Sequence, residues 1–196
     1  MNKKKITILI LAAVFVAIIS VIYLRFYPIA FVGWQPVIYG DFSKNYNAAV
    51  FYYEKALLTY NKNNSEIINS SEVRNEIKRA GLEASVEDII ILNELEKFFS
   101  GLEIKNQMDK NISAAIGGKD VEKETETLYG LSSGQFVKYF LEPQARREIL
   151  EARLHLENVL PNGNFDQWLI DAKRQVKVMI FLPGFEWKDG TVIIKK

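Results

Sequence analysis

The sequence predicts a mainly α-helical protein, in which an N-terminal transmembrane helix precedes a multi-helix domain. A small β-sheet is formed by strands from both ends of the exported region. Three observations predict this class: an uncharged apolar run opens the chain, the middle carries apolar residues at helical spacing, and alternating apolar residues occur near both ends of the remainder. Strands that meet in one sheet would close this remainder into a single domain.

The opening apolar run covers residues 6–24 and contains no charged side chain. As a helix it would measure about 28 Å, close to the hydrocarbon thickness of a bilayer. Three lysines precede it and Arg25 follows, so the positive charge places residues 1–5 in the cytoplasm and exports the rest. The alternative is a cleaved signal peptide, but the run exceeds the usual length of about 7–15 residues and no convincing A-x-A site follows. We therefore expect an uncleaved, single-pass anchor in the cell membrane.

Composition excludes several classes of function. The chain has no cysteine, which rules out disulfides, a thiolate metal site, a cysteine nucleophile and a lipid-modified cysteine. Four basic residues flank the apolar run, so 21 of the 25 remain for positions 26–196, against all 24 acidic residues. The exported part therefore carries a net charge of −3. Nucleic-acid binding requires a basic surface, so no nucleic-acid partner is expected.

The region after the anchor begins with a linker, a strand and a long helix. Residues 25–33 are expected to form a juxtamembrane linker, and PVIYG at 36–40 a short strand. Residues 41–62 place apolar side chains on one helical face: Phe42, Tyr46, Ala49, Val50, Tyr53, Leu57 and Tyr60. The polar stretch NKNNS at 61–65 ends this helix.

Further helices are predicted up to residue 175, with segments at 71–80, 85–100, 103–116, 120–129, 143–160 and 165–175. Glycines end four of them: Gly81, Gly101, Gly117 and Gly130. Serine or asparagine caps several of the starts: Ser71, Ser85 in a capping box with Asp88, Ser132 or Ser133, and Asn164. Pro143 suits the first turn of a helix. Residues 176–182 then alternate as a strand, and a hairpin turns at Asp189-Gly190.

The residues that could carry catalysis are few. His155 is the only histidine and lies in a leucine-rich helix, where an imidazole is more often packed or half exposed than a ligand. Carboxylates such as Glu122, Glu124 and Glu126 occupy helix-surface positions, and nothing pairs two of them in a dry pocket. We therefore expect no catalytic residues, no metal site and no cofactor.

Four apolar side chains are candidates for binding a partner. Phe51 and Leu58 lie opposite the main apolar face of the 41–62 helix, so they require either a second layer of packing or a ligand. Phe136 and Tyr139 lie in the stretch LYGLSSGQFVKYFL, in which Phe136 and Phe140 share one face as an anchor for the following helix. Core packing is the alternative for each of the four.

The segments LYGLSSGQFVKYFLEPQARREILEARL and FDQWLIDAKRQVKVMIFL resemble the N-terminal chaperone domain of SurA, PrsA and trigger-factor-like proteins. The matching positions are Tyr129, Gly130, Leu131, Ser132, Phe136, Arg146, Arg147, Leu150 and Leu154. The resemblance implies that residues 34–196 form a SurA N-like helical chaperone domain with C-terminal strands. Many relatives carry a parvulin prolyl isomerase before the final helix, whereas this chain has only NVLPNGN at 158–164.

The resemblance implies a membrane-anchored, extracytoplasmic chaperone-like domain without catalysis. Its partners would be unfolded or newly exported polypeptides, bound through Phe51, Leu58, Phe136 and Tyr139, and the lipid bilayer, contacted through residues 6–24. Prolyl isomerase activity is not expected, because the parvulin domain is missing and one histidine cannot supply the pair typical of such sites. The alternative is a structural or scaffold subunit of a cell-envelope complex that binds one fixed partner.

Overall fold

The computed structural model describes residues 23, 25–60, 70–160 and 163–195. These residues form a mainly helical fold with two small antiparallel sheets, which confirms that part of the predicted fold class. The apolar run 6–24, predicted to span the membrane, lies outside the described residues except for Tyr23. No helix among the described residues is long and apolar enough to cross a membrane.

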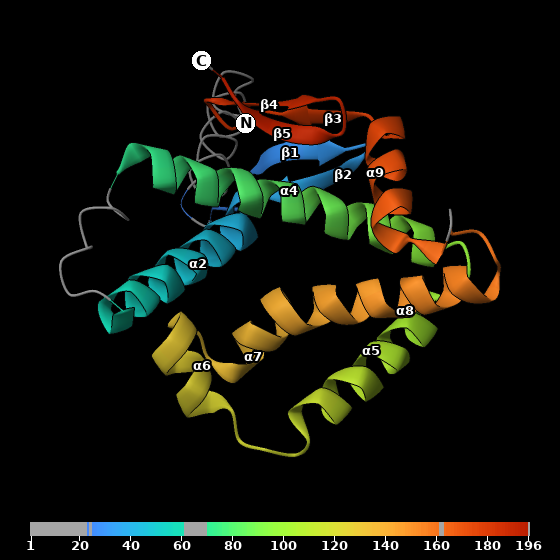
Figure 1. Cartoon of the computed structure of the whole chain (residues 1–196), viewed down its shortest axis with the longest axis horizontal. Helices are drawn as coiled ribbons and strands as arrows, with labels where there is room; N and C mark the ends of the chain where they lie inside the picture. Colours follow the sequence, from blue (N-terminus) through green and yellow to red (C-terminus); the bar gives the residue numbers. More distant parts are fainter. Residues whose placement is uncertain (1–22, 24, 61–69, 161–162, 196) are drawn as a thin grey trace, which may run out of the picture.

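The larger sheet joins the two ends of the described chain (Figure 1). Its strands are β1 (Pro28–Val32), β2 (Gln35–Ile38) and β3 (Val178–Ile180), in the antiparallel order β2-β1-β3. Strands from the two ends therefore share one sheet, as predicted, but the predicted N-terminal strand pairs with β1 and not with β3. The central strand of this sheet is β1. Residues 28–32 therefore form a strand, which corrects the expectation that residues 25–33 form a linker.

The central position of β1 follows from its apolar side chains. Ile29, Ala30 and Val32 are at most 3% exposed, so the strand contributes more to the core than to the surface. Pro28 lacks an N–H group, but it occupies the first residue of the strand, where proline is tolerated. Pro28 and Pro36 both lie within the paired strands β1 and β2 and do not interrupt the sheet.

The second sheet is the predicted C-terminal hairpin. Its strands are β4 (Phe185–Lys188) and β5 (Thr191–Ile194), joined at Asp189 and Gly190. The φ angles of these two residues are 51° and 84°, and a type I′ turn requires positive φ at both central positions. The predicted turn is therefore confirmed in position and in conformation.

One helix, α4 (Ser71–Leu95), replaces the two helices predicted at 71–80 and 85–100. Its buried side chains form a continuous stripe: Ile77, Leu82, Val86, Ile90, Ile91 and Leu95. Burial of that stripe outweighs the weak helix propensity of one glycine, which is about 1 kcal/mol relative to alanine. The predicted break is therefore wrong because tertiary packing decides the structure there.

The residues expected to break the helix have other roles within it. Gly81 faces the Phe42 ring, whose Cε2 would lie 3.7 Å from a Cβ placed on that glycine. Ser85 donates a hydrogen bond from Oγ to the Gly81 carbonyl at 2.9 Å instead of capping a new helix. The observed cap of α4 is Ser70, one residue before the predicted Ser71, and its Oγ accepts from the Val73 N–H at 3.3 Å.

The remaining helices are α2 (Tyr39–Tyr60), α5 (Gly101–Ile116), α6 (Glu122–Tyr129), α7 (Ser133–Phe136), α8 (Glu142–Leu156) and α9 (Phe165–Gln175), and the π-helical turn η1 (Val137–Leu141) joins α7 to α8. Most predicted end signals are confirmed: Gly117 and Gly130 are left-handed C-caps, Ser132 and Asn164 are N-caps, and Pro143 lies in the first turn of α8. Local chemistry therefore sets most helix ends.

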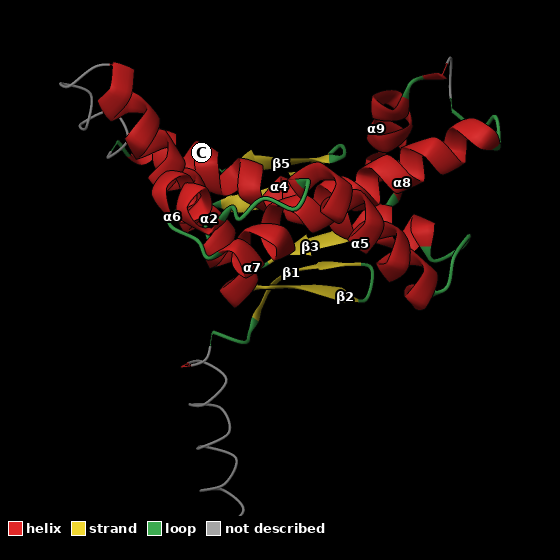
Figure 2. Cartoon of the chain, turned by 90° about the horizontal axis from the view of Figure 1, so that it is seen from below, coloured by secondary structure: helices red, strands yellow, loops and turns green. Residues whose placement is uncertain are grey.

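Helix α4 lies between the strands and α8 (Figure 1). Its Leu82, Val86 and Leu95 are fully buried, as are Leu150 and Leu154 of α8. The strands lie on one side of α4, and α5, α6 and α7 lie on the other, away from the sheets (Figures 1 and 2). The core therefore has α4 at its centre.

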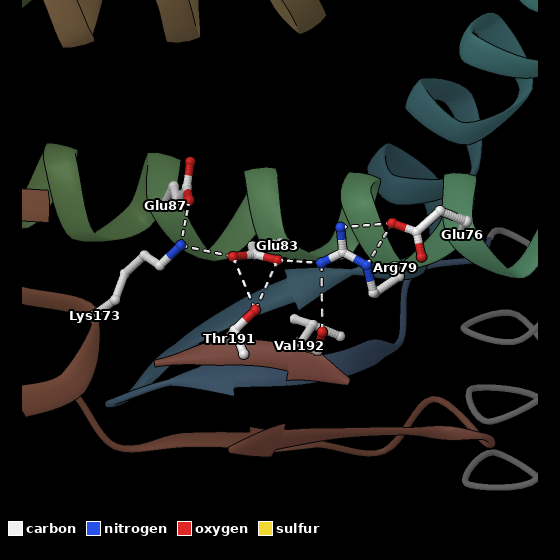
Figure 3. A network of polar contacts seen from close by, with 7 residues as sticks. All are labelled: Glu76, Arg79, Glu83, Glu87, Lys173, Thr191 and Val192. Carbon is white, nitrogen blue, oxygen red and sulfur yellow. Dashed lines mark hydrogen bonds and ion pairs between the residues drawn. The ribbon is translucent and has the colours of Figure 1, made fainter. Parts of the chain in front are cut away.

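A cluster of charged side chains holds the C-terminal elements to α4 (Figure 3). We call it the polar clasp; its members are Arg79, Glu83, Glu87, Lys173 and Thr191. Lys173 of α9 is buried and places Nζ 2.6 Å from a carboxylate oxygen of both Glu83 and Glu87. Burial alone would raise the pKa of Glu83, but Lys173 and Arg79 outweigh it and hold that pKa below its ordinary value.

Candidate functional site

The elbow between α6 and α8 positions the site. Gly130 ends α6 with φ of 66°, a left-handed conformation that glycine adopts without strain. Ser132 starts α7 in a capping box, in which its Oγ accepts from the Gln135 N–H and Gln135 bonds back to the Ser132 N–H. The chain then continues through η1 into α8 without a break in the helical path.

Four aromatic rings stack across this elbow, and we call them the aromatic ladder: Tyr52, Tyr129, Phe136 and Phe140. Tyr52 of α2 stacks on Tyr129 of α6 with centroids 5.2 Å apart and planes 10° apart. Tyr129 also lies 5.0 Å from Phe136 and 5.2 Å from Phe140, and these two phenylalanines stack at 5.3 Å. The ladder therefore fastens α2 to α6, α7 and η1 through ring contacts alone.

Apolar side chains around the ladder remain open to solvent. We call them the aromatic surface: Tyr52, Tyr53, Leu58 and Leu128, which are 41%, 51%, 54% and 44% exposed. Tyr53 packs edge-on against Tyr52 at 6.0 Å, so the exposed rings continue the ladder outward. Tyr53 was expected on the buried face of α2, and its exposure corrects that expectation. Helix α4 covers another side of α2, so these side chains stay partly exposed among the described residues.

Phe51 lies beside the ladder and is half-buried. Its ring packs against the backbone of Gly130, where an added Cβ would come within 3.5 Å of the ring. The ammonium of Lys55 lies 5.2 Å from the centroid of that ring. A shallow pocket beside it is lined by Lys44, Asn47, Ala48, Phe51, Tyr129, Gly130, Leu131 and Gln135. Since 3.5 Å is an ordinary contact distance, the positive φ of Gly130 is what favours glycine at this elbow.

The four candidate binding residues occupy three different environments. Phe51 and Phe136 meet near Tyr129 at the ladder, both half-buried. Leu58 is exposed toward the C-terminal end of α2, on the aromatic surface. Tyr139 is 8% exposed and donates its hydroxyl to Asp41 at 2.9 Å, so it lies in the core. The structure therefore places two of the four together, leaves one nearby and separates the fourth.

Tyr139 borders a polar cavity of about 250 Å³ between the start of α2, the middle of α4 and η1. Its apolar walls include Val37, Phe42 and Ile89. Across the cavity, Arg146 donates from Nε and Nη2 to the two carboxylate oxygens of Asp88 at 2.8 and 2.9 Å. This bidentate pair fixes α8 to α4 and closes one wall of the cavity.

Polar groups at the cavity are mostly paired within the chain. Burial alone would raise the pKa of Asp41, but hydrogen bonds from Lys138 and Tyr139 outweigh it and hold that pKa below its ordinary value. Hydrogen bonding to Asp41 raises the pKa of Lys138. Asp41 is therefore ionised at neutral pH and is poorly suited to general acid–base work. Asn45 is the exception, because its Oδ1 is buried without a partner among the described residues.

Metal-binding geometry is absent from the described part of the chain, where no three His, Asp or Glu side chains could hold a metal ion. His155 is exposed on α8, and the acidic side chains of α6 point largely to solvent. Glu122 accepts a hydrogen bond from the Ser133 N–H at 2.8 Å, which ties α6 to α7. Hydrogen bonding to the Ser133 side chain and to this N–H lowers the pKa of Glu122. These carboxylates therefore contribute to the elbow.

Several site residues were not identified from the sequence: Tyr52, Leu128, Asp41 and Asn45. The pair Tyr52-Tyr53 gave a usable signal, because adjacent helix residues point about 100° apart and two large rings extend beyond a narrow buried stripe. The ladder partners of Tyr52 come from segments about 75 residues away along the chain, which no local pattern reveals. No protein-family model, no curated protein sequence and no solved structure matches the chain.

Proposed function

We propose that the chain is a membrane-tethered, extracytoplasmic chaperone-like domain that binds unfolded or newly exported polypeptides without catalysis. The observation that carries the proposal is the aromatic surface, where Tyr52, Tyr53 and Leu128 stay exposed beside an already stacked ladder. Exposed apolar side chains grouped beside an ordered scaffold are typical of a protein-binding surface. Tyrosine suits this role because it offers a large apolar face together with a hydroxyl.

The resemblance to the SurA N-terminal domain supports the same proposal. Tyr129, Gly130 and Phe136 are among the positions that carry it, and all three build the elbow under the aromatic surface. Leu58 is part of that surface, and Phe51 lies beside it on α2. Tyr139 is the weakest of the four candidates, because its buried ring and its bond to Asp41 leave little for a client to contact.

Binding through this surface should be weak and reversible. A client that covers it removes about 300 Å² of apolar surface from water, a gain of about 7.5 kcal/mol at 25 cal/mol per Å². Association costs at least about 4 kcal/mol in lost freedom, which leaves at most about 3.5 kcal/mol and a Kd in the millimolar range or weaker. A membrane tether offsets this weakness by concentrating the domain where exported chains emerge.

Aggregation assays with several unrelated unfolded proteins test the proposal. The full chain, reconstituted in vesicles, should slow the aggregation of all of them, and Tyr53→Ser/Leu128→Ser should lose most of that effect. Ile170→Ser/Leu156→Ser is the matched control, because these side chains are also exposed but lie on α9 and α8. Retained activity in Tyr53→Ser/Leu128→Ser would contradict the proposed site. Co-purification with one native partner and no effect on the others would favour the alternative, a scaffold subunit of an envelope complex.

A further inference from the structure

A second exposed apolar area lies on the outer face of the larger sheet. Phe31 of β1 stands opposite Pro36 of β2 and Met179 of β3 in the antiparallel register. Cross-strand neighbours point to the same side of a sheet, so these three side chains share one face. The neighbouring residues Ala30 and Val32 point the other way and are fully buried.

Aromatic residues extend this face at both ends. The Phe181 ring packs edge-on against Phe31 at 5.9 Å and is 56% exposed, and Met179 is 42% exposed. Trp34 at the tip of the β1–β2 hairpin is 95% exposed. We call Phe31, Trp34, Pro36, Met179 and Phe181 the sheet face. It is separated from the aromatic surface on α2 and α6, since the sheet and the elbow lie at opposite sides of the molecule in Figure 1.

The exposed tryptophan is held in place by backbone structure. Gly33 precedes it with φ of 59°, the conformation that a two-residue type II′ hairpin turn requires at its first central position. The Gly33 N–H donates to the Lys177 carbonyl at 2.9 Å, which ties the hairpin tip to the start of β3. Trp34 is therefore presented to solvent from a fixed turn.

The sheet face is almost free of charge. Residues 26–38 contain no charged side chain, and residues 176–182 contain only Lys177, in a chain that is 25% charged. A water-facing sheet surface usually carries charges of both signs. A surface that lacks acidic groups can approach the anionic headgroup region of a bilayer at little desolvation cost. Arg25 and Lys177 are exposed and offer positive charge for phosphate groups at its margins.

Chain length places the sheet face near the apolar run. That run ends at residue 24 and β1 begins at Pro28, so three intervening residues reach at most about 10 Å. Phe26, between them, is 68% exposed. Tryptophan side chains close to a membrane span are typical of the interface between lipid and water.

We propose that the sheet face rests on the lipid headgroup region of the bilayer, with Trp34 inserted at the interface. This inference rests on the proposed function only in taking residues 6–24 as the membrane span. Contact through the sheet orients the domain, so that the α6–α7 elbow and the aromatic surface face away from the lipid and stay open to clients. The sheet therefore acts as a second, peripheral membrane contact.

Tryptophan quenching by brominated lipids tests this inference in the full chain reconstituted in phosphatidylcholine vesicles with a minor share of phosphatidylglycerol. Trp168→Phe/Trp187→Phe leaves Trp34 as the only tryptophan. Its emission should shift to the blue, and lipids brominated near the headgroup end of the acyl chain should quench it about two-fold. Trp34→Phe/Trp187→Phe is the matched control, because the remaining Trp168 packs on Phe165 of α9 and should not be quenched.

A second measurement covers the case in which the double variants do not fold. The chain has no cysteine, so Trp34→Cys carries a single spin label on a turn whose native side chain makes little packing contact. The label should be more accessible to oxygen than to a water-soluble nickel complex.

The outcomes separate this inference from the proposed function. If the chain floats with the vesicles in a density gradient, which shows that it is membrane-bound, but Trp34 is not quenched, the sheet face is not a lipid contact and the inference is wrong. A blue shift without bromine quenching would indicate a protein on this face and would also overturn it. A chain that does not float contradicts both the span and the lipid contact. Client binding is measured independently in the aggregation assay, so its loss alone leaves the lipid contact standing.

Discussion

The polar clasp and the aromatic surface differ in which side chains they bury. The clasp buries charged groups, whereas the aromatic surface leaves apolar groups exposed. In the clasp, charged groups that would be costly to bury alone are buried as ion pairs, and Lys173 pairs with both Glu83 and Glu87. On the aromatic surface, side chains that would gain from burial remain in water, although Tyr52 already stacks on Tyr129. The clasp therefore holds the fold together, while the exposed rings are left available for something outside the chain. Substitutions at the two regions should affect different properties.

Lys173→Met should have the largest effect on stability. It leaves Glu83 and Glu87 half-buried without their shared cation, although Arg79 still pairs with Glu83. Breaking a buried pair costs about 3–5 kcal/mol, and the partial exposure here reduces the expected loss to about 2–3 kcal/mol. Urea unfolding measures this loss in the free energy of unfolding. The matched control, Lys105→Met, removes an exposed pair with Asp109 and should cost less than about 0.5 kcal/mol. Equal losses in both variants would contradict a structural role for the clasp.

Gly130→Ala should destabilise the fold by about 1–2 kcal/mol and also weaken client binding. The alanine Cβ is strained at φ of 66° and would also contact the Phe51 ring at 3.5 Å, so the backbone strain falls on the elbow that carries the ladder. Gly117→Ala is the control for backbone strain alone, because its φ is 62° and nothing lies within 4 Å of the added Cβ. A similar loss of client binding in both variants would mean that the elbow does not position the site.

Gly81→Ala should stabilise the protein, by about 0.5–1 kcal/mol. Its φ is negative, it lies inside α4, and the added methyl group meets Phe42 at an ordinary contact distance of 3.7 Å. Thermal unfolding should show a higher Tm, with client binding unchanged. A lower Tm would mean that the helix needs flexibility at this position.

Acid should weaken the clasp selectively. The pKa of Glu83 in the folded protein lies below its ordinary value of 4.5, so its contribution is present above about pH 4.5 and is lost as pH falls toward the folded pKa. Glu83→Gln should therefore lose less stability than the unsubstituted chain between pH 5 and pH 3, measured by urea unfolding. Parallel pH profiles for the two proteins would contradict the assignment.

The sequence predicted features that depend on local chemistry, such as the glycine ends of α5 and α6 and the serine cap of α7. It did not predict β1 or the unbroken α4, because both depend on burial against segments distant in the chain. At the site, Phe51 was identified because its helix holds more apolar residues than one face can bury, and Phe136 because several aromatic residues follow the break at Gly130. For Tyr139 the burial in η1 favours the core alternative.

Tyr53→Ser should have the smallest effect on stability, below about 0.5 kcal/mol, because the side chain is half exposed and lies outside the ladder stack. Its effect on client binding should nevertheless exceed that of Lys173→Met, measured at a temperature at which both proteins are folded. The reverse order would mean that the clasp, rather than the aromatic surface, carries function.

Site-specific photocrosslinking tests the central claim most directly. A photoreactive phenylalanine analogue is placed at position 53 or, as the control, at position 170 of the full chain in membranes, and each is irradiated with several unrelated unfolded polypeptides. Position 53 should crosslink to all of them, and position 170 of α9 to few or none. Equal crosslinking from both positions, or crosslinking from position 53 to a single native protein only, would contradict the account.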